Sequence, residues 1–260
     1  MQVLSDAIKT LEGHIQNQKL EEAKELLVEK LKGLSHENFE DRAIIYYYLL
    51  RTYLQGDVHI ENAILVDYYE KMVMNFRRQE QKYKEEISHL KNKKLERRVH
   101  IMQYKAYYKL VERYFSSLEL LYGKKDFHET RQKAFLEKMR YRKNFYHLKK
   151  EYISVLGYFM MDMTSQYGTS FVRWGITTLL FILFFGWLFM VIDMATTGGH
   201  MIKGGALYNY FYFSVVAFTT VGFGDITPVT GIEKLLVAFE ILSGYVMLGM
   251  LINLIQRKLR

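Results

Sequence analysis

Seven consecutive residues in the last quarter of the chain have the types and spacing to bind a cation stripped of its water. The run is Thr219-Thr220-Val221-Gly222-Phe223-Gly224-Asp225, in which glycines occupy alternate positions. Successive carbonyls of an ordinary strand point to opposite sides, and alternate glycines relieve this because they reach backbone angles that side chains forbid. The carbonyls of Thr220, Val221, Gly222 and Phe223 would then form one row of ligands, with the Thr220 hydroxyl at its inner end.

The elements on either side of this run predict where it lies. Val172 to Ile192 and Leu235 to Ile255 are apolar stretches of 21 residues, with Arg173 and Glu240 as their only charges. As helices, each would be about 31 Å long, which is the thickness of the hydrocarbon core of a bilayer. Ala206 to Phe218 is aromatic-rich and too short to cross, so we expect a re-entrant helix.

The sequence TTVGFGD, after a short aromatic helix and before a second span, resembles the pore of the two-span potassium channel family over about residues 165–257. The resemblance implies an all-α membrane protein in which potassium ions are the permeant species and the filter carbonyls replace the hydration shell. One loop supplies a quarter of such a filter, so the expected unit is a homotetramer with cyclic symmetry.

The filter surroundings depart from the family pattern at several positions. Phe223 replaces the commoner tyrosine, and Tyr212 and Phe213 occupy the place of a frequent tryptophan pair. Val216 stands where some members have a glutamate that pairs with the filter aspartate. Asp225 therefore needs another partner or water.

The second span contains two glycines and one acid with alternative interpretations. Gly244 and Gly249 are candidates for a gating bend, although glycines also let membrane helices approach closely. Glu240 is expected to turn toward the re-entrant helix and to bond Ser214 or a tyrosine, with ion binding as the alternative. We therefore group Tyr212, Phe213, Ser214 and Glu240 as filter support.

Residues 1–150 contain no proline and read as helix throughout, with apolar residues three and four apart. Three helical hairpins are expected, with small alanines at helix contacts and Gly-Asp turns, and they resemble tetratricopeptide repeats. The distance from Ala23 to Ala63 is 40 residues, not the 34 of that repeat, so a generic helical bundle is equally open. Tyrosines are expected to pack the hairpins. The predicted segments are Leu4–Gln16 with Leu20–Leu31, Ala43–Tyr53 with a helix opening at Glu61, and Tyr104–Tyr122 with Phe127–Leu148.

Three domains follow: a cytoplasmic helical domain at 1–150, a linker helix at 151–170 and the pore domain at 171–260. The linker is strongly apolar but is interrupted by Ser154, Gly157 and Asp162. We expect it to lie on the inner membrane surface, with the last helix of the soluble bundle as the alternative.

The charges are segregated along the chain. The formal charge is +8, and residues 71–150 alone have 23 basic and 9 acidic side chains, net +14, whereas residues 1–70 are net −6. No nucleic-acid-binding motif accompanies the basic run. Attraction to anionic lipids of the inner leaflet is favoured, with a solvated face or pairing with the acidic part of a neighbouring subunit as alternatives.

Orientation and class follow from the same residues. Basic residues precede the first span and follow the second, so the positive-inside rule predicts a multi-pass protein of the cell membrane with both termini in the cytoplasm.

The chain has no cysteine, and no catalytic constellation stands out, so we expect neither an enzyme nor a cofactor. Regulation is expected through residues 1–170, by a cytoplasmic ligand or protein. The alternatives are a membrane-anchored interaction scaffold with an inert pore and a potassium transporter subunit.

Overall fold

The computed structural model describes residues 19–56, 62–90, 93–195, 201–202 and 206–259. All regular structure in these ranges is helical, which confirms the predicted fold class. The chain divides into two compact units, residues 1–155 and 156–260. The predicted helix Leu4–Gln16 lies outside the described residues.

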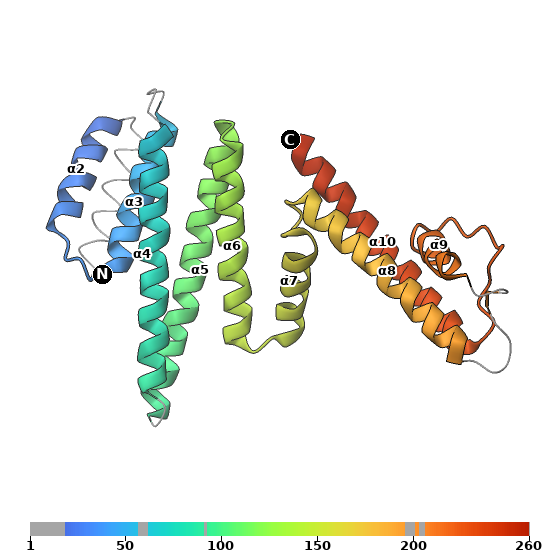
Figure 1. Cartoon of the computed structure of the whole chain (residues 1–260). Coiled ribbons are helices and arrows are strands. Elements are labelled where there is room, and N and C mark those ends of the chain that lie inside the picture. Colours follow the sequence, from blue (N-terminus) through green and yellow to red (C-terminus); the bar gives the residue numbers. More distant parts are fainter. Residues whose placement is uncertain (1–18, 57–61, 91–92, 196–200, 203–205, 260) are drawn as a thin grey trace. The chain divides into compact units, whose positions relative to one another are not determined.

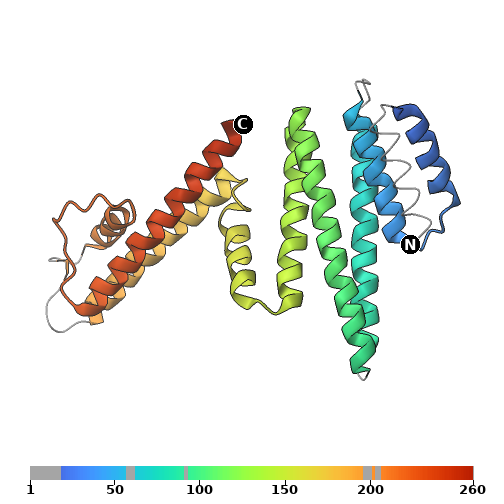
Figure 2. The ribbon, with the colours of Figure 1, turned by 180° about the vertical axis from the view of Figure 1, so that it is seen from behind.

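Unit 1 is a row of long helices in which consecutive members run antiparallel and pack side by side (Figures 1 and 2). The pairs α3 with α4 and α5 with α6 make the most extensive contacts, so two of the predicted hairpins are present. The helices are α2 (Leu20–Gly33), α3 (Phe39–Gln55), α4 (Asn62–His89), α5 (Lys94–Lys124) and α6 (His128–Lys149).

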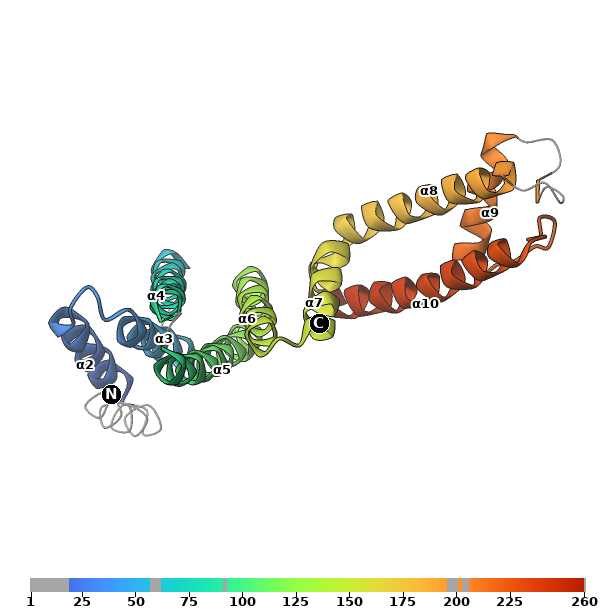
Figure 3. The ribbon, with the colours of Figure 1, turned by 90° about the horizontal axis from the view of Figure 1, so that it is seen from below.

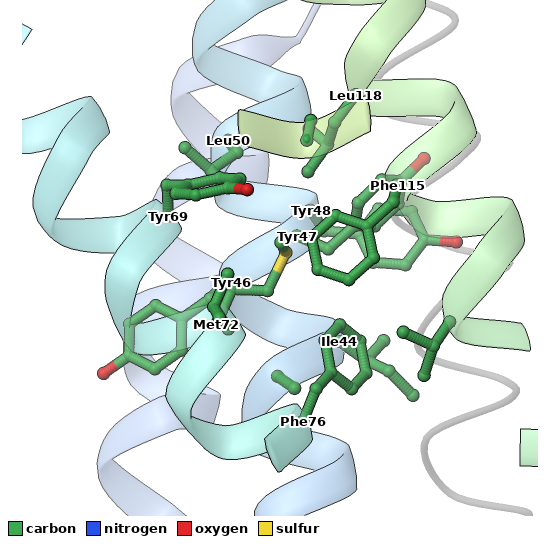
Figure 4. Close-up of a cluster of buried hydrophobic side chains, with 14 of the residues drawn as sticks. Ile44, Tyr46, Tyr47, Tyr48, Leu50, Tyr69, Met72, Phe76, Phe115 and Leu118 are labelled. Atoms are coloured by element: carbon green, nitrogen blue, oxygen red, sulfur yellow. The ribbon is translucent and has the colours of Figure 1, made fainter. Parts of the chain in front are cut away.

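The core of unit 1 is aromatic, and α3 lies at its centre because every residue from Ala43 to Leu50 is buried. Side chains of α3, α4 and α5 meet there, as Figure 4 shows. Tyr47 lies 4.3 Å from Tyr114 between ring centres, and Phe115 stacks on Tyr141 at 5.8 Å. The prediction that tyrosines pack the hairpins is confirmed.

A buried carboxylate ties three of these helices together. Glu80 of α4 accepts hydrogen bonds from the Tyr108 hydroxyl and the Asn144 amide, each at 3.1 Å. Its oxygens also lie 2.7 Å from Lys84 Nζ and 3.3 Å from Arg140 Nη2. Each carboxylate oxygen thus has donors, which is the condition for keeping a charge inside a protein.

The alanine pattern holds only in part. Ala23 and Ala43 are fully buried where helices touch, as expected. Ala63 is exposed, so the prediction that it marks a helix contact is wrong. It lies two residues before Leu65, which faces the core from the opposite side of α4. The repeat-like spacing therefore loses one of its two anchors, and the tetratricopeptide resemblance stays a prediction.

Unit 2 contains the two helices predicted to span a membrane. They are α8 (Phe171–Ala195) and α10 (Gly231–Leu259), and both are long and apolar enough to cross a bilayer. The short helix α9 (Leu207–Phe218) contacts both of them and bridges the pair in Figure 3. This is the span, re-entrant helix and span order that the sequence predicted.

A helix corresponding to the predicted linker precedes the first span. It is α7 (Tyr152–Ser165), and the boundary between the two units falls inside it, after Val155. Three consecutive residues, Gln166, Tyr167 and Gly168, then have left-handed φ of 51°, 56° and 74°. This tight reversal is closed by bonds from the backbone N–H groups of Gly168, Thr169 and Ser170 to the Ser165 carbonyl. The division at 150 and 170 stays a prediction.

Candidate functional site: a pore loop between two spans

The filter loop has the backbone alternation that its sequence predicts. Thr220, Gly222 and Gly224 have left-handed φ of 60°, 56° and 79°, and the intervening Val221 and Phe223 do not. This alternation turns successive carbonyls to the same side of the chain. Thr220 holds this conformation despite its β-branched side chain, which is an uncommon and strained state. The loop can therefore offer a row of carbonyl oxygens to a cation.

The filter loop begins directly after the C-terminus of α9. The N–H of Thr219 bonds the Val215 carbonyl at 2.9 Å, and the N–H of Val221 bonds the Val216 carbonyl at 3.1 Å. The last turn of α9 thus fixes where the filter begins. A helix C-terminus has a partial negative charge, which favours a cation near this point.

Asp225 has a partner that compensates for the valine at position 216. The Tyr212 hydroxyl donates to Asp225 Oδ2 at 2.8 Å, across 13 residues of chain. Both side chains are exposed in the single chain. Tyr212 was grouped with the filter support because of its position, and this contact gives it a partner. Phe213 faces the other way, and its ring packs edge-on against Phe189 of α8 at 5.2 Å.

Ser214 connects α9 to both spans. Its Oγ donates to the Ile182 carbonyl of α8 at 2.9 Å and also contacts Glu240 Oε1 of α10. Ser214 and Glu240 are both fully buried. The expected contact between Glu240 and Ser214 is therefore present.

The two glycines of α10 have different surroundings. A Cβ added at Gly244 would lie 2.2 Å from the Phe218 carbonyl oxygen, which leaves no room for a side chain. Nothing lies within 4 Å of the same position at Gly249. The close approach of α10 to the end of α9 gives Gly244 a packing role, which was the alternative to a hinge. A bend at either glycine stays a prediction.

Two acids at the ends of the spans that adjoin the pore loop had drawn no interpretation from the sequence. Asp193 near the end of α8 is fully buried and accepts from the N–H of Met201, at 2.5 Å, and from the Tyr210 hydroxyl, at 2.7 Å. It thereby ties the start of α9 to α8. A lone acid late in an apolar helix was the available signal.

The second of these acids, Glu233, lies in the first turn of α10. Its Oε2 accepts from the N–H groups of Val229 and Thr230 at 2.8 and 2.9 Å, and the Thr230 hydroxyl accepts from the N–H of Glu233. This is a capping box, and the sequence signal was a threonine followed three residues later by a glutamate. It fixes the point at which the chain leaves the filter and enters the second span.

At the end of the spans away from the filter loop, contacts join the corner between α7 and α8 to α10. Trp174 Nε1 donates to the Met247 carbonyl at 3.0 Å. The Thr177 hydroxyl donates to the Thr164 carbonyl at 3.3 Å, and the Thr164 hydroxyl lies 3.8 Å from the Met250 sulfur. The corner between α7 and α8 thus contacts the segment of α10 that follows Gly244.

Unit 1 contains a cavity of about 630 Å³ between α4 and α6. Its walls combine apolar side chains with three cations and two carboxylates, of which Arg77 and Glu137 form an ion pair. Tyr69 lines it, and its buried hydroxyl has no hydrogen-bond partner in the structure. Burial raises the pKa of Tyr69 far above its usual range, so the phenol stays neutral. A cavity of this size and composition is suited to a small organic ligand.

Comparison with known proteins agrees with the geometry of unit 2. The family model described as ion channel matches residues 177–260. A segment of 43 residues is 49% identical to two-pore potassium channel 4 of Arabidopsis thaliana, which is 16% of this chain and 15% of that protein. The chain thus matches only a small part of that relative's length. No solved structure matches the chain.

Two apolar spans with a re-entrant helix and a filter loop between them define a pore-loop membrane protein. The match of residues 177–260 to the ion channel family model, together with the potassium channel relative, confirms the resemblance of this region to two-span potassium channels. The match does not extend to the helices of unit 1.

Proposed function

We propose that the chain is one subunit of a potassium-selective channel in the cell membrane, in which four copies surround a single pore. The left-handed φ at Thr220, Gly222 and Gly224 is the observation that carries this proposal. It supports a row of carbonyl oxygens on one side of the loop, and four such rows would replace the water around a potassium ion. The potassium channel relative supports the same ion, through its name and the shared segment.

The fourfold assembly is supported by what a single chain leaves exposed. Val221 and Phe223 are 54% and 70% exposed, and so are large apolar side chains along α8 and α10. A bilayer covers part of this surface, but the filter itself is complete only when other subunits face it. The distribution of basic residues supports a cytoplasmic location for both termini. The channel is a passive pore without enzymatic activity or cofactor.

The helices of unit 1 are the proposed regulatory part. A ligand in the cavity between α4 and α6, or a protein on their surface, would act on α7 and through its corner on α10. The basic surface of residues 71–150 would hold this unit near anionic lipids of the inner leaflet. Deletion of residues 1–140 is expected to change the open probability of single channels, and an unchanged open probability would refute this part.

Ion flux from proteoliposomes tests the pore itself. Potassium-loaded vesicles containing the full chain are expected to lose potassium quickly, in a sodium medium that provides the gradient. Gly222→Ala places a side chain at φ 56° and is expected to abolish the flux. Gly175→Ala in α8 is the matched control, because nothing lies within 4 Å of the added methyl group. Equal flux from both variants would contradict the assignment of the filter.

The alternative function, a membrane-anchored scaffold with an inert pore, is favoured by the size of unit 1. It predicts tetramers that bind a partner through unit 1 but release no potassium from vesicles. The same flux measurement therefore separates the two functions.

A further inference from the structure

The Ser214 hydroxyl lies between two oxygen atoms on two other helices. Its Oγ is 2.9 Å from the Ile182 carbonyl oxygen of α8 and within hydrogen-bonding distance of Glu240 Oε1 of α10. A serine hydroxyl has one hydrogen to donate, and a carbonyl has none. Both contacts can be hydrogen bonds only if the second hydrogen comes from Glu240. A protonated carboxyl group supplies it, and an ionised one does not.

The surroundings of Glu240 offer nothing that would hold a negative charge. The Glu240 side chain is fully buried, with an exposed fraction of 0%. Its second oxygen, Oε2, is buried without a hydrogen-bond partner. No described basic side chain forms an ion pair with it. An ionised carboxylate with a single neutral neighbour is expensive to bury.

The charged groups on the packed helices are remote or already engaged. On α8 they are Arg173 and Asp193, nine and eleven residues from Ile182 and so about 14 and 16 Å along the axis. Helix α9 has no charged residue, and its titratable groups Tyr210 and Tyr212 bond Asp193 and Asp225. The remaining titratable groups nearby are Tyr208 on α9 and Glu233, Lys234 and Tyr245 on α10 itself. None of these groups forms a hydrogen bond or an ion pair with Glu240.

We propose that Glu240 is a neutral carboxylic acid whose Oε1–H donates to Ser214 Oγ, and that the Ser214 hydroxyl in turn donates to the Ile182 carbonyl. The chain of two bonds runs from α10 through α9 to α8 and clamps the middle of the re-entrant helix between the two spans. Glu240 is thus a positioning residue, which acts on the filter through α9 and touches no permeant ion. The proposal deepens the proposed function and rests on it only where current is measured.

The direction of the pH dependence of these two hydrogen bonds follows from the proton on Glu240. The clamp is complete while Glu240 keeps its proton, and it is lost as rising pH removes that proton. Once Glu240 has lost its proton, the single hydrogen of the Ser214 hydroxyl is shared between two acceptors. Either the Ile182 carbonyl or the buried Glu240 carboxylate is then left without a donor. The filter is therefore expected to lose conducting stability at alkaline pH and to keep it at neutral and acid pH.

Infrared spectroscopy tests the protonation state without any need for conduction. The reconstituted full chain is compared with Glu240→Gln at neutral pH, and the difference spectrum is expected to contain the carbonyl stretch of a neutral carboxylic acid. Alkaline pH is expected to replace it by carboxylate bands. Carboxylate bands already present at neutral pH would overturn the proposal, whether or not the protein conducts potassium.

Variants test the clamp as a positioning device. Glu240→Gln keeps a donor for Ser214, so relative to Glu240→Ala it is expected to rescue the thermal stability of the tetramer and the current. Its current is also expected to lose the alkaline sensitivity of the wild type. Ser214→Ala is expected to weaken both properties, as Glu240→Ala does. The proposal fails if Glu240→Gln is as defective as Glu240→Ala, or if its alkaline sensitivity equals that of the wild type.

Discussion

Each unit buries a glutamate among its helices, and the two carboxyl groups have opposite surroundings. Glu80 in unit 1 receives hydrogen bonds from Tyr108 and Asn144 and lies beside Lys84 and Arg140. Glu240 in unit 2 has one polar neighbour, the Ser214 hydroxyl, and a second oxygen without a partner. The donors present, and not burial alone, decide whether such a group is a charge or a neutral acid.

The units also differ in how their helices meet. In unit 1, large aromatic side chains fill the space between long helices, as around Phe76 and Phe115. In unit 2, a glycine allows the backbone of one helix to approach another, at Gly244 of α10 against the backbone of Phe218 at the end of α9. Side-chain packing tolerates some repacking, whereas a backbone contact at a glycine has no side chain that can move aside. Unit 2 is therefore expected to be the more sensitive to added volume.

The largest expected effect is at that backbone contact. Gly244→Ala places a methyl group 2.2 Å from the Phe218 carbonyl oxygen and is expected to cost about 3 kcal/mol, enough to reduce assembly and current strongly. Gly249→Ala, with nothing within 4 Å, is expected to assemble as the wild type does. Tetramer yield in detergent and macroscopic current measure both. Normal assembly of Gly244→Ala would show that α9 and α10 are less closely packed than described.

The second largest effect is expected when the hydrogen-bonded Glu80 carboxylate of unit 1 is removed. Glu80→Ala removes the acceptor of Tyr108 and Asn144 and is expected to cost about 2 kcal/mol, because Lys84 and Arg140 are partly exposed and regain water. Faster hydrogen exchange in α4, α5 and α6 measures it. Glu85→Ala, an exposed site on the same helix, is the control. Equal exchange in both variants would contradict the role of the network.

A smaller effect is expected at the outer end of the filter. Tyr212→Phe removes the bond to Asp225, which is exposed in the single chain, so a smaller loss is expected than at the buried sites. Current that decays faster during sustained opening is the expected result. Tyr208→Phe, at a side chain 72% exposed, is the control and should leave the decay unchanged.

Alkaline titration tests the buried tyrosines of unit 1. Burial raises the pKa of Tyr69, Tyr104 and Tyr122 above the ordinary value near 10. A raised pKa means that the neutral phenol stabilises the fold below pH 10 and that this contribution is lost as pH rises further. Tyrosinate absorbance should therefore appear in two steps, with the second accompanied by unfolding of unit 1. A single step near pH 10 would contradict the buried core.

The pore was largely predictable from the sequence because its constraints are local. The left-handed backbone at Gly222 and Gly224 follows from residue type, and the spans follow from length and hydropathy. The contact of Tyr212 with Asp225 was open, because it joins residues 13 apart whose distance depends on the path of the loop. The role of Asp193 was missed because its partners are the backbone N–H of Met201, outside any helix, and the Tyr210 hydroxyl of α9, and no sequence pattern joins these residues.

Unit 1 was predictable in its helices and less so in its contacts. The turns at Gly56 and after Lys124 are signalled by residue type. Helices α4 and α6 begin within one residue of the predicted positions, whereas α3 begins four residues and α5 ten residues before them. The exposure of Ala63 and the burial of Glu80 could not be read from a helical period. Both lie on α4, and the partners that bury Glu80, Tyr108 and Asn144, come from α5 and α6, far along the chain.

The reversal potential of the full chain in a planar bilayer tests the central claim most directly. Unequal potassium and sodium concentrations on the two sides give each ion its own equilibrium potential. The filter described for residues 219–225 predicts a reversal near the potassium value, with discrete single-channel openings. A reversal near the sodium value would contradict the proposal that these residues select potassium.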